Sequence, residues 1–418
     1  MKKANFYLFG ALLLFIVTSF SMVSCGEAVN TNFDPHFDNE GHLIDSSYRF
    51  TPIAPNKIKF YVEVSGSMNG FFRANSPTKF KADVWQILSY FSPLTDGVTI
   101  LTNDGSQGKT FPLAQFQTLM NTGGFVSTAS TKVPLMLQSI IQSLDTDAGE
   151  VAVLISDMKY SPVGQAAPAV LLSQYSTDVS TIFGKFNKAI SLVGATSEYL
   201  DKNGNPVCLS SPYYYLILGN AEQVAEMRNG ISTLLENNET FIDNIESGFN
   251  YGAPSYAFGI PENAYQLDEE PTFLGFDPSY SDTCTIKLNI DLANYRWAIT
   301  DKTLFEEAFI CKTLYGSEVK VGNVEFYIEN ITNKTLRRTA VAIVDLKLCN
   351  MATESEVIEW SLQLPDLDIT KFSPYLDAND ENDVTKSFSL ENFIKGMFYG
   401  GVVNKSLSPN YILISKHS

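Results

Sequence analysis

The residues best suited to chemistry in this chain lie between Glu63 and Ser67, in the sequence EVSGS. They follow the apolar, β-prone run 58–62, so a buried strand would deliver one carboxylate and two hydroxyls onto a tight turn. Carboxylate and hydroxyl oxygens are the hard ligands that Mg²⁺ and Ca²⁺ prefer. This stretch therefore predicts a divalent-cation site at the carboxyl edge of a sheet.

Two further polar residues stand at comparable positions along the chain. Asp157 follows the apolar run 151–155, and Thr131 lies just ahead of a helical stripe over 133–144. Thr128 is the alternative to Thr131, which we prefer because it is in better register with the buried face of that helix. Both residues are oxygen donors that the same sheet edge could bring to the turn.

The chain offers few groups for catalysis. Its three histidines are near the termini, so zinc-hydrolase and Ser-His-Asp schemes lack their usual base within the folded body. The acidic stretch 377–383 lacks the central glycine and the bidentate glutamate of a calcium loop, and a solvated acidic turn is the preferred interpretation. We therefore assign no catalytic residue and expect the chain not to be an enzyme.

Strands and helices alternate through the first half of the chain. Strands are expected near 58–62, 98–101, 151–155, 190–194 and 213–218, and helices near 80–91, 113–120, 133–144, 179–189 and 221–235. The sequence KNGN at 202–205 predicts a turn. Strands that are apolar throughout indicate a sheet covered on both faces. We expect an α/β fold, with a doubly wound, mostly parallel sheet, over residues 56–238.

The hydrophobic period changes after residue 238. Apolar and polar residues then alternate in several segments, with one helix expected near 390–398. The segments lie near 284–292, 324–328, 343–348 and 357–364. Half-buried strands separated by turns are typical of antiparallel sheets, which predicts a β-rich, sandwich-like C-terminal domain over 239–418.

The N-terminus has the features of a signal peptide. Lys2 and Lys3 precede the apolar run 6–20, and the sequence MVSC that ends at Cys25 resembles a bacterial lipobox. This resemblance implies a lipoprotein of the bacterial cell envelope, in the outer membrane. The signal peptide, residues 1–25, ends at the lipobox cysteine; cleavage before Cys25 would leave that residue as the acylated N-terminus. Whether the protein faces the periplasm or the cell surface stays open. Residues 26–55 would be a polar tether. An ordinary secretory signal or a transmembrane anchor is the alternative.

The net charge limits the class of binding partner, and the cysteines limit the possible disulfide and zinc chemistry. The chain carries 46 acidic and 29 basic side chains, a net charge of −17, which disfavours binding to nucleic acid and favours cations or basic partners. Besides Cys25 there are four cysteines, at 208, 284, 311 and 349. In an envelope protein they could form disulfides or remain buried thiols, and their spacing matches no zinc motif.

The EVSGS turn, Thr131 and Asp157 together resemble the metal-ion-dependent adhesion site of the von Willebrand factor type A domain. The resemblance covers the first half of the mature chain. It implies that Ser65, Ser67, Thr131 and Asp157 hold Mg²⁺, or else Ca²⁺ or Mn²⁺. Glu63 stands where the family has aspartate and extends the carboxylate by about 1.5 Å, so the ion could shift, bind through water, be Ca²⁺, or be absent.

The resemblance implies a binding function. An open coordination position would take an Asp or Glu carboxylate from a partner protein, so the chain would be a lipid-anchored envelope protein for cation-assisted protein–protein interaction. One alternative is a metal-free scaffold in an envelope assembly. A cation-dependent hydrolase is a further alternative, which lacks a base and a second acidic ligand set.

Overall fold

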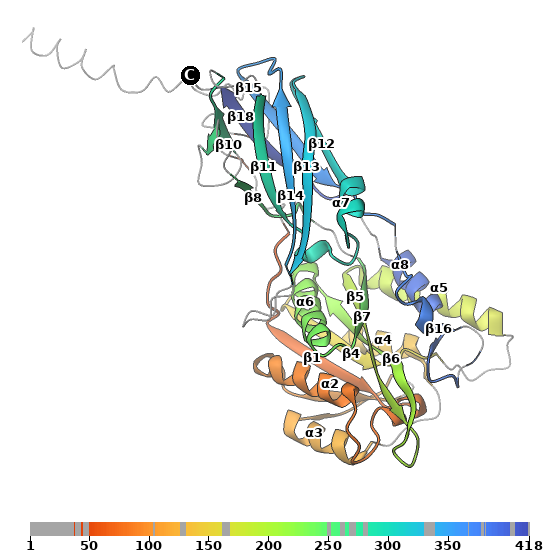
Figure 1. The fold of residues 1–418 in the computed structure, drawn as a ribbon. Coiled ribbons are helices and arrows are strands. Elements are labelled where there is room, and N and C mark those ends of the chain that lie inside the picture. Colours follow the sequence, from red (N-terminus) through yellow and green to blue (C-terminus); the bar gives the residue numbers. More distant parts are fainter. Residues whose placement is uncertain are drawn as a thin grey trace, which may run out of the picture.

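The structure is a computed structural model in which part of the chain is described (Figure 1). The described residues are 37, 43–44, 50–102, 105–125, 131–160, 168–248, 252–259, 264–266, 273–278, 283–329, 339–366, 368–377, 380, 382–401 and 406–416. The expected signal peptide, Cys25, most of the tether, Thr128 and the three histidines lie outside them. Within these ranges, no helix is both long and apolar enough to cross a membrane.

A seven-stranded mixed sheet forms the centre of an α/β lobe (Figure 1). Its strands, in order across the sheet, are β3 (Gln107–Phe111), β2 (Val98–Leu101), β1 (Lys57–Glu63), β4 (Glu150–Ser156), β6 (Pro206–Gly219), β5 (Ala189–Leu200) and β7 (Phe241–Ser247). The three adjacent strands β2, β1 and β4 are parallel to one another. Every other neighbouring pair is antiparallel.

The sheet is mixed, so the expectation of a mostly parallel sheet is wrong, and the connection between β5 and β6 gives the reason. β5 and β6 are joined by a tight turn in which Asn205 and Asn203 donate backbone N–H groups to the Asp201 carboxylate. Strands joined by so short a turn must be antiparallel, because a parallel pair needs a crossover of a dozen residues or more. β7 then adds to the free edge of β5, also antiparallel. The sheet is parallel only where the first strands of the lobe lie.

Helices cover both faces of the sheet, as the apolar strands predicted. One face carries α2 (Lys79–Tyr90), α3 (Leu113–Thr122) and α6 (Ala221–Asn237), and the other carries α4 (Val133–Ser143), α5 (Pro168–Phe186) and α8 (Leu390–Gly400). Each set of helices shares a separate apolar cluster with its face of the sheet. The central strands are consequently buried on both sides, and their carboxyl ends are held in fixed positions.

Two mostly antiparallel sheets form the β-rich lobe. One contains β12 (Phe309–Thr313), β15 (Ser355–Leu362), β18 (Asn410–Lys416), β10 (Phe273–Phe276) and β9 (Ala264–Gln266); the other contains β13 (Glu318–Glu329), β14 (Thr339–Cys349), β11 (Thr283–Asp291) and β8 (Tyr256–Gly259). Trp360 of β15 packs against Tyr256 of β8 with ring centroids 5.2 Å apart, so the two sheets share a core. The lobe contains three cysteines, at 284, 311 and 349, and β6 contains a fourth, at 208; all four are free thiols.

The chain passes between the two lobes more than once. β7 lies beyond residue 238 yet belongs to the seven-stranded sheet, and α8 packs against α5 although it follows most of the β-rich lobe in sequence. Figure 1 shows α8, in blue, beside the yellow-green α5 and away from β15 and β18. A Cβ on Gly396 or Gly400 would come within 2.6 Å of a backbone carbonyl of α5, so only glycine allows this approach. Both lobes therefore contain residues from the C-terminal half.

A buried ion pair of the α/β lobe lies where the two lobes meet. Arg228 of α6 pairs with Glu246 of β7, and both side chains are almost fully buried. The Arg228 guanidinium also donates to the backbone carbonyl of Asn294, on the short helix η3 (Ala293–Tyr295), at 3.4 Å. Burial raises the pKa of the Glu246 carboxyl to about 7, against the opposing effect of Arg228. Phe37 and Phe50, from the expected tether, are also buried.

Candidate functional site

The five residues predicted as cation ligands converge at one edge of the seven-stranded sheet. Glu63 is the last residue of β1, and Asp157 directly follows the neighbouring parallel strand β4. Ser65 and Ser67 are on the turn after β1, where the short helix η1 (Gly66–Gly70) begins. Thr131 comes just before α4. Parallel neighbours end on the same side of a sheet, and this brings residues far apart in sequence together.

Both oxygens of the Glu63 carboxyl are hydrogen-bonded. The Thr131 hydroxyl donates to Oε1 at 3.0 Å, and the Ser156 hydroxyl donates to Oε2. The Ser156 oxygen in turn accepts the Met158 backbone N–H at 2.8 Å. Glu63 is thus held between a hydroxyl from the chain before α4 and one from the end of β4.

The two serines of the turn lie between the carboxyls. The hydroxyl oxygens of Ser65 and Ser67 are 2.8 Å apart and hydrogen-bonded. Ser65 occupies the position before η1 with an extended backbone, and its side chain makes no helix-capping hydrogen bond. Its hydroxyl therefore serves the polar cluster, not the helix.

Asp157 has one satisfied and one unsatisfied oxygen. Its Oδ1 accepts the Lys159 backbone N–H at 3.2 Å. Its Oδ2 is buried and has no hydrogen-bond partner within the described part of the chain. Buried polar atoms are rarely left unpaired, so an orphaned acceptor points to a missing donor or cation.

Burial controls the protonation of the two carboxyls. Removal from water, and then the negative charge of Asp157, raises the pKa of Glu63 to about 7, and the hydroxyls of Ser156, Ser65 and Thr131 oppose this rise. Burial also raises the pKa of Asp157, while the charge of Lys159 and the Ser67 hydroxyl lower it. The pair therefore takes up a proton near neutral pH, well above the range of an ordinary carboxyl.

The site is closed to solvent in this conformation. Glu63 is 0 % exposed, Asp157 1 % and Thr131 2 %, while Ser67 is half-buried. A carboxylate from another protein would reach these oxygens only past Ser67 or after a local opening. In this conformation the buried oxygens could bind an ion, but a carboxylate of a partner protein could not reach that ion directly.

Four residues near the site were not among the predicted ligands. Ser156 adjoins Asp157 in the sequence, so its position was visible there. Lys159 is buried two residues later. Tyr175 of α5 has a buried phenol oxygen with no hydrogen-bond partner among described residues, and its pKa is raised chiefly by burial, then by Tyr160 and Glu63. Ser387 donates to the Asp157 carbonyl at 2.8 Å, and nothing in the sequence relates the two.

The donor set fits a hard divalent cation. Two carboxyls and three hydroxyls supply only oxygen, and Asp157 Oδ2 is an acceptor without a donor. No cluster of three or more His, Cys, Asp or Glu side chains suited to a metal ion occurs in the described ranges. This is consistent with a site in which hydroxyls replace most of the carboxylates, since such a site needs only two acidic residues.

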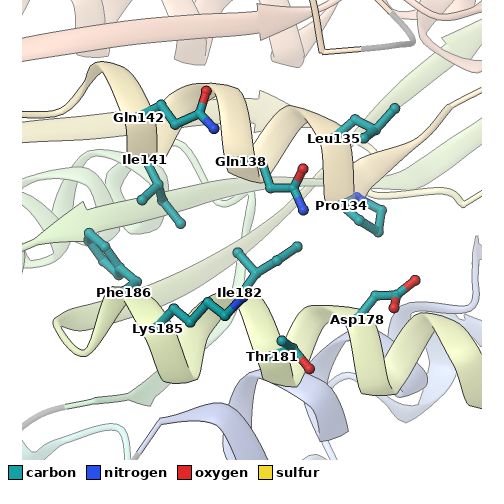
Figure 2. Close-up of a pocket in the computed structure, with 10 residues that line it drawn as sticks. All are labelled: Pro134, Leu135, Gln138, Ile141, Gln142, Asp178, Thr181, Ile182, Lys185 and Phe186. Atoms are coloured by element: carbon teal, nitrogen blue, oxygen red, sulfur yellow. The ribbon is translucent and has the colours of Figure 1, made fainter.

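A groove of about 590 Å³ lies between α4 and α5 (Figure 2). Gln138 of α4 faces Ile182 of α5 across it, and Ile141 and Phe186 lie toward one end. None of the five predicted ligands lines this groove. It is a feature separate from the polar site, although α4 begins two residues after Thr131 and so contributes to both.

Comparisons with protein-family models, with curated proteins and with solved structures found no match to this chain.

Proposed function

We propose that this protein is a cell-envelope binding protein that uses the Glu63–Asp157 site for divalent-cation-assisted interaction with another protein. The observation that supports this best is the convergence of five oxygen-bearing side chains around a buried carboxylate oxygen that has no partner in the described residues. Mg²⁺ is the favoured ion, with Ca²⁺ or Mn²⁺ as alternatives. The proposal makes the chain a relative of the von Willebrand factor type A domain.

The sheet order is compatible with that relationship. Doubly wound sheets bind ligands at the carboxyl ends of their strands. The strands β3, β2, β1 and β4 lie in the order 3-2-1-4, and β2, β1 and β4 are parallel to one another as in a doubly wound sheet, although β3 is antiparallel to β2. The half formed by β6, β5 and β7 departs from it. We therefore confine the proposed relationship to the part of the sheet that carries Glu63 and Asp157.

The chain's own residues would divide the work of binding. Asp157 Oδ2, Ser65 and Ser67 would hold the ion, with Thr131 orienting Glu63. A bound cation would supply positive charge to attract an Asp or Glu carboxylate of the partner. Glu63 accepts one hydroxyl donor at each oxygen, and an ionised carboxylate has further lone pairs with which it could also bind the ion.

Attachment to a membrane is part of the same proposal. It rests on the lipobox-like sequence that ends at Cys25, outside the described residues. The net charge of −17 favours a cation between two acidic surfaces. An outer-membrane lipoprotein with an acidic protein partner satisfies both features.

A metal-free scaffold is the second candidate, and one observation favours it. Burial and the charge of Asp157 raise the pKa of Glu63 to about 7, so near neutral pH its carboxyl can be protonated and the cluster then carries less negative charge without an ion. In that case the site would be a buried polar network that fixes the loops at the sheet edge.

We expect Mg²⁺ to stabilise the protein and the Asp157→Asn variant to lose this response. At a concentration 100 times the dissociation constant, binding adds about 2.7 kcal/mol to the free energy of unfolding, since only the folded state has the site. For a protein of this size the melting temperature would rise by about 3 °C. Melting curves with and without Mg²⁺, Mn²⁺ and Ca²⁺, at pH 8, measure the effect.

Asp83→Asn is the matched control, because Asp83 is equally buried but accepts from Tyr213 and Asn238 away from the site. That variant should melt at a lower temperature yet keep the full Mg²⁺ response. The same melting temperature for the unsubstituted protein with all three ions and without them would contradict cation binding and favour the scaffold.

A further inference from the structure

The loop that carries Asp157 is held by a segment more than 200 residues later in the chain. Residues 382–389, which we call the strap, lie between the β-rich lobe and α8. The Ser387 hydroxyl donates to the Asp157 carbonyl at 2.8 Å. The Lys159 ammonium donates to the Asp383 carbonyl at 2.7 Å, and the Tyr160 N–H donates to the Phe388 carbonyl at 3.4 Å. Three of the four residues that follow β4 are thus bound to the strap.

The strap is anchored on its other side as well. The Ser211 hydroxyl of β6 donates to the Val384 carbonyl. Ser387 and Ser389 are almost fully buried, and α8 begins directly after them. Because α8 packs closely on α5, the strap is fixed at its C-terminal end by helix packing and along its length by hydrogen bonds.

We propose that the strap positions the Asp157 carboxylate for cation binding and that Ser387 is the positioning residue. This inference rests on the proposed function. Ser387 contacts the peptide that bears the ligand and not the ligand oxygens, so it acts as an outer-shell partner. Such partners fix the orientation of a ligand, and their loss typically lowers metal affinity by about 10- to 100-fold.

The local geometry explains how a backbone contact can orient a side chain. Asp157 Oδ1 accepts the Lys159 N–H two residues later, so the carboxylate and the backbone of 157–159 form one hydrogen-bonded turn. Ser387 holds the first peptide of this turn and Asp383 holds the Lys159 side chain. Without the strap the turn can rotate, and the Asp157 carboxylate is no longer held in one orientation.

The test compares two serine-to-alanine variants of the full mature chain. Ser387→Ala removes the contact to the Asp157 carbonyl. Ser247→Ala is the matched control, because Ser247 is also about 1 % exposed and also donates at 2.8 Å to a carbonyl of the C-terminal half, that of Met397, away from the site. Two quantities are measured: the Mg²⁺ dissociation constant by titration calorimetry, and hydrogen–deuterium exchange of the Lys159 amide without added ion.

We expect Ser387→Ala to raise both the Mg²⁺ dissociation constant and the Lys159 exchange rate by about tenfold or more. Ser247→Ala should change each by less than about twofold. Equal behaviour of the two variants in both measurements would overturn the proposal. If the unsubstituted protein binds no Mg²⁺, the proposed function fails, and Lys159 exchange alone then decides whether the strap positions Asp157. If Ser387→Ala does not fold, Ser211→Ala, which frees the strap at Val384, takes its place.

Discussion

A fragment that ends at Asn238 will not fold into the α/β lobe. It lacks β7, so the edge of β5 is left unpaired, and it lacks the strap and α8, so the face of the sheet beside α5 is exposed. α8 contributes four fully buried apolar side chains, Leu390, Phe393, Ile394 and Met397. Burial of each side chain is worth about 1.5–3 kcal/mol, and the sum rivals the 5–15 kcal/mol that holds a typical domain together.

Circular dichroism and thermal melting of residues 26–238 test this expectation against residues 26–418. The longer chain should unfold cooperatively, and the fragment should show no cooperative transition or should aggregate. A cooperative melt of the fragment at a temperature near that of the longer chain would show that the lobe is independent of its C-terminal segments.

Glu63→Gln should abolish the Mg²⁺ response and stabilise the cation-free protein above neutral pH. The pKa of Glu63 is raised from its ordinary 4.5 to about 7 in the folded state. The folded protein therefore binds a proton more tightly than the unfolded chain, and stability falls as the pH rises from about 4.5 through 7. Above pH 7 the buried ionised carboxylate costs up to about 3 kcal/mol, which a neutral amide avoids.

Denaturant unfolding at pH 5, 6, 7 and 8 measures how the stability difference between Glu63→Gln and the unsubstituted protein changes with pH. The variant and the unsubstituted protein should differ least at pH 5, with the variant gaining as the pH rises. For the unsubstituted protein, Mg²⁺ stabilisation should grow over the same range, because the cation competes with the proton on Glu63. A stability difference that does not depend on pH, or a Mg²⁺ response that survives in Glu63→Gln, would contradict this account of the pair.

The position of the candidate site was predictable because it depends on local signals. A buried strand that ends in Glu63, an apolar run that ends before Asp157, and a threonine ahead of a helix are each visible within a few residues. Parallel neighbours then place strand ends together, whatever the rest of the sheet does. Ser156 was equally predictable, since it adjoins Asp157, but its hydroxyl attracts attention only once it points at Glu63.

The second half of the sheet was mispredicted although a signal was present. The Asn203-Gly204 turn is a strong hairpin signal, and Gly204 has the positive φ of 86° that such turns need. Its consequence, that β5 and β6 must be antiparallel, follows from chain geometry. β7 had no comparable signal. Its buried Glu246 breaks the apolar alternation and is explained only by Arg228, which comes from another element.

The sequence by itself determined the type of fold, the edge of the sheet where polar residues gather, and the chemical nature of those residues. These features follow from hydrophobic periodicity and from side-chain types, which act over one or two turns of chain. The tertiary structure alone decided the pairing of β6 with β4 and of β7 with β5, the closure of the site, the raised pKa of Glu63, and the contact between Ser387 and Asp157. Each of these depends on burial or on pairing between distant segments, and neither leaves a local trace in the sequence.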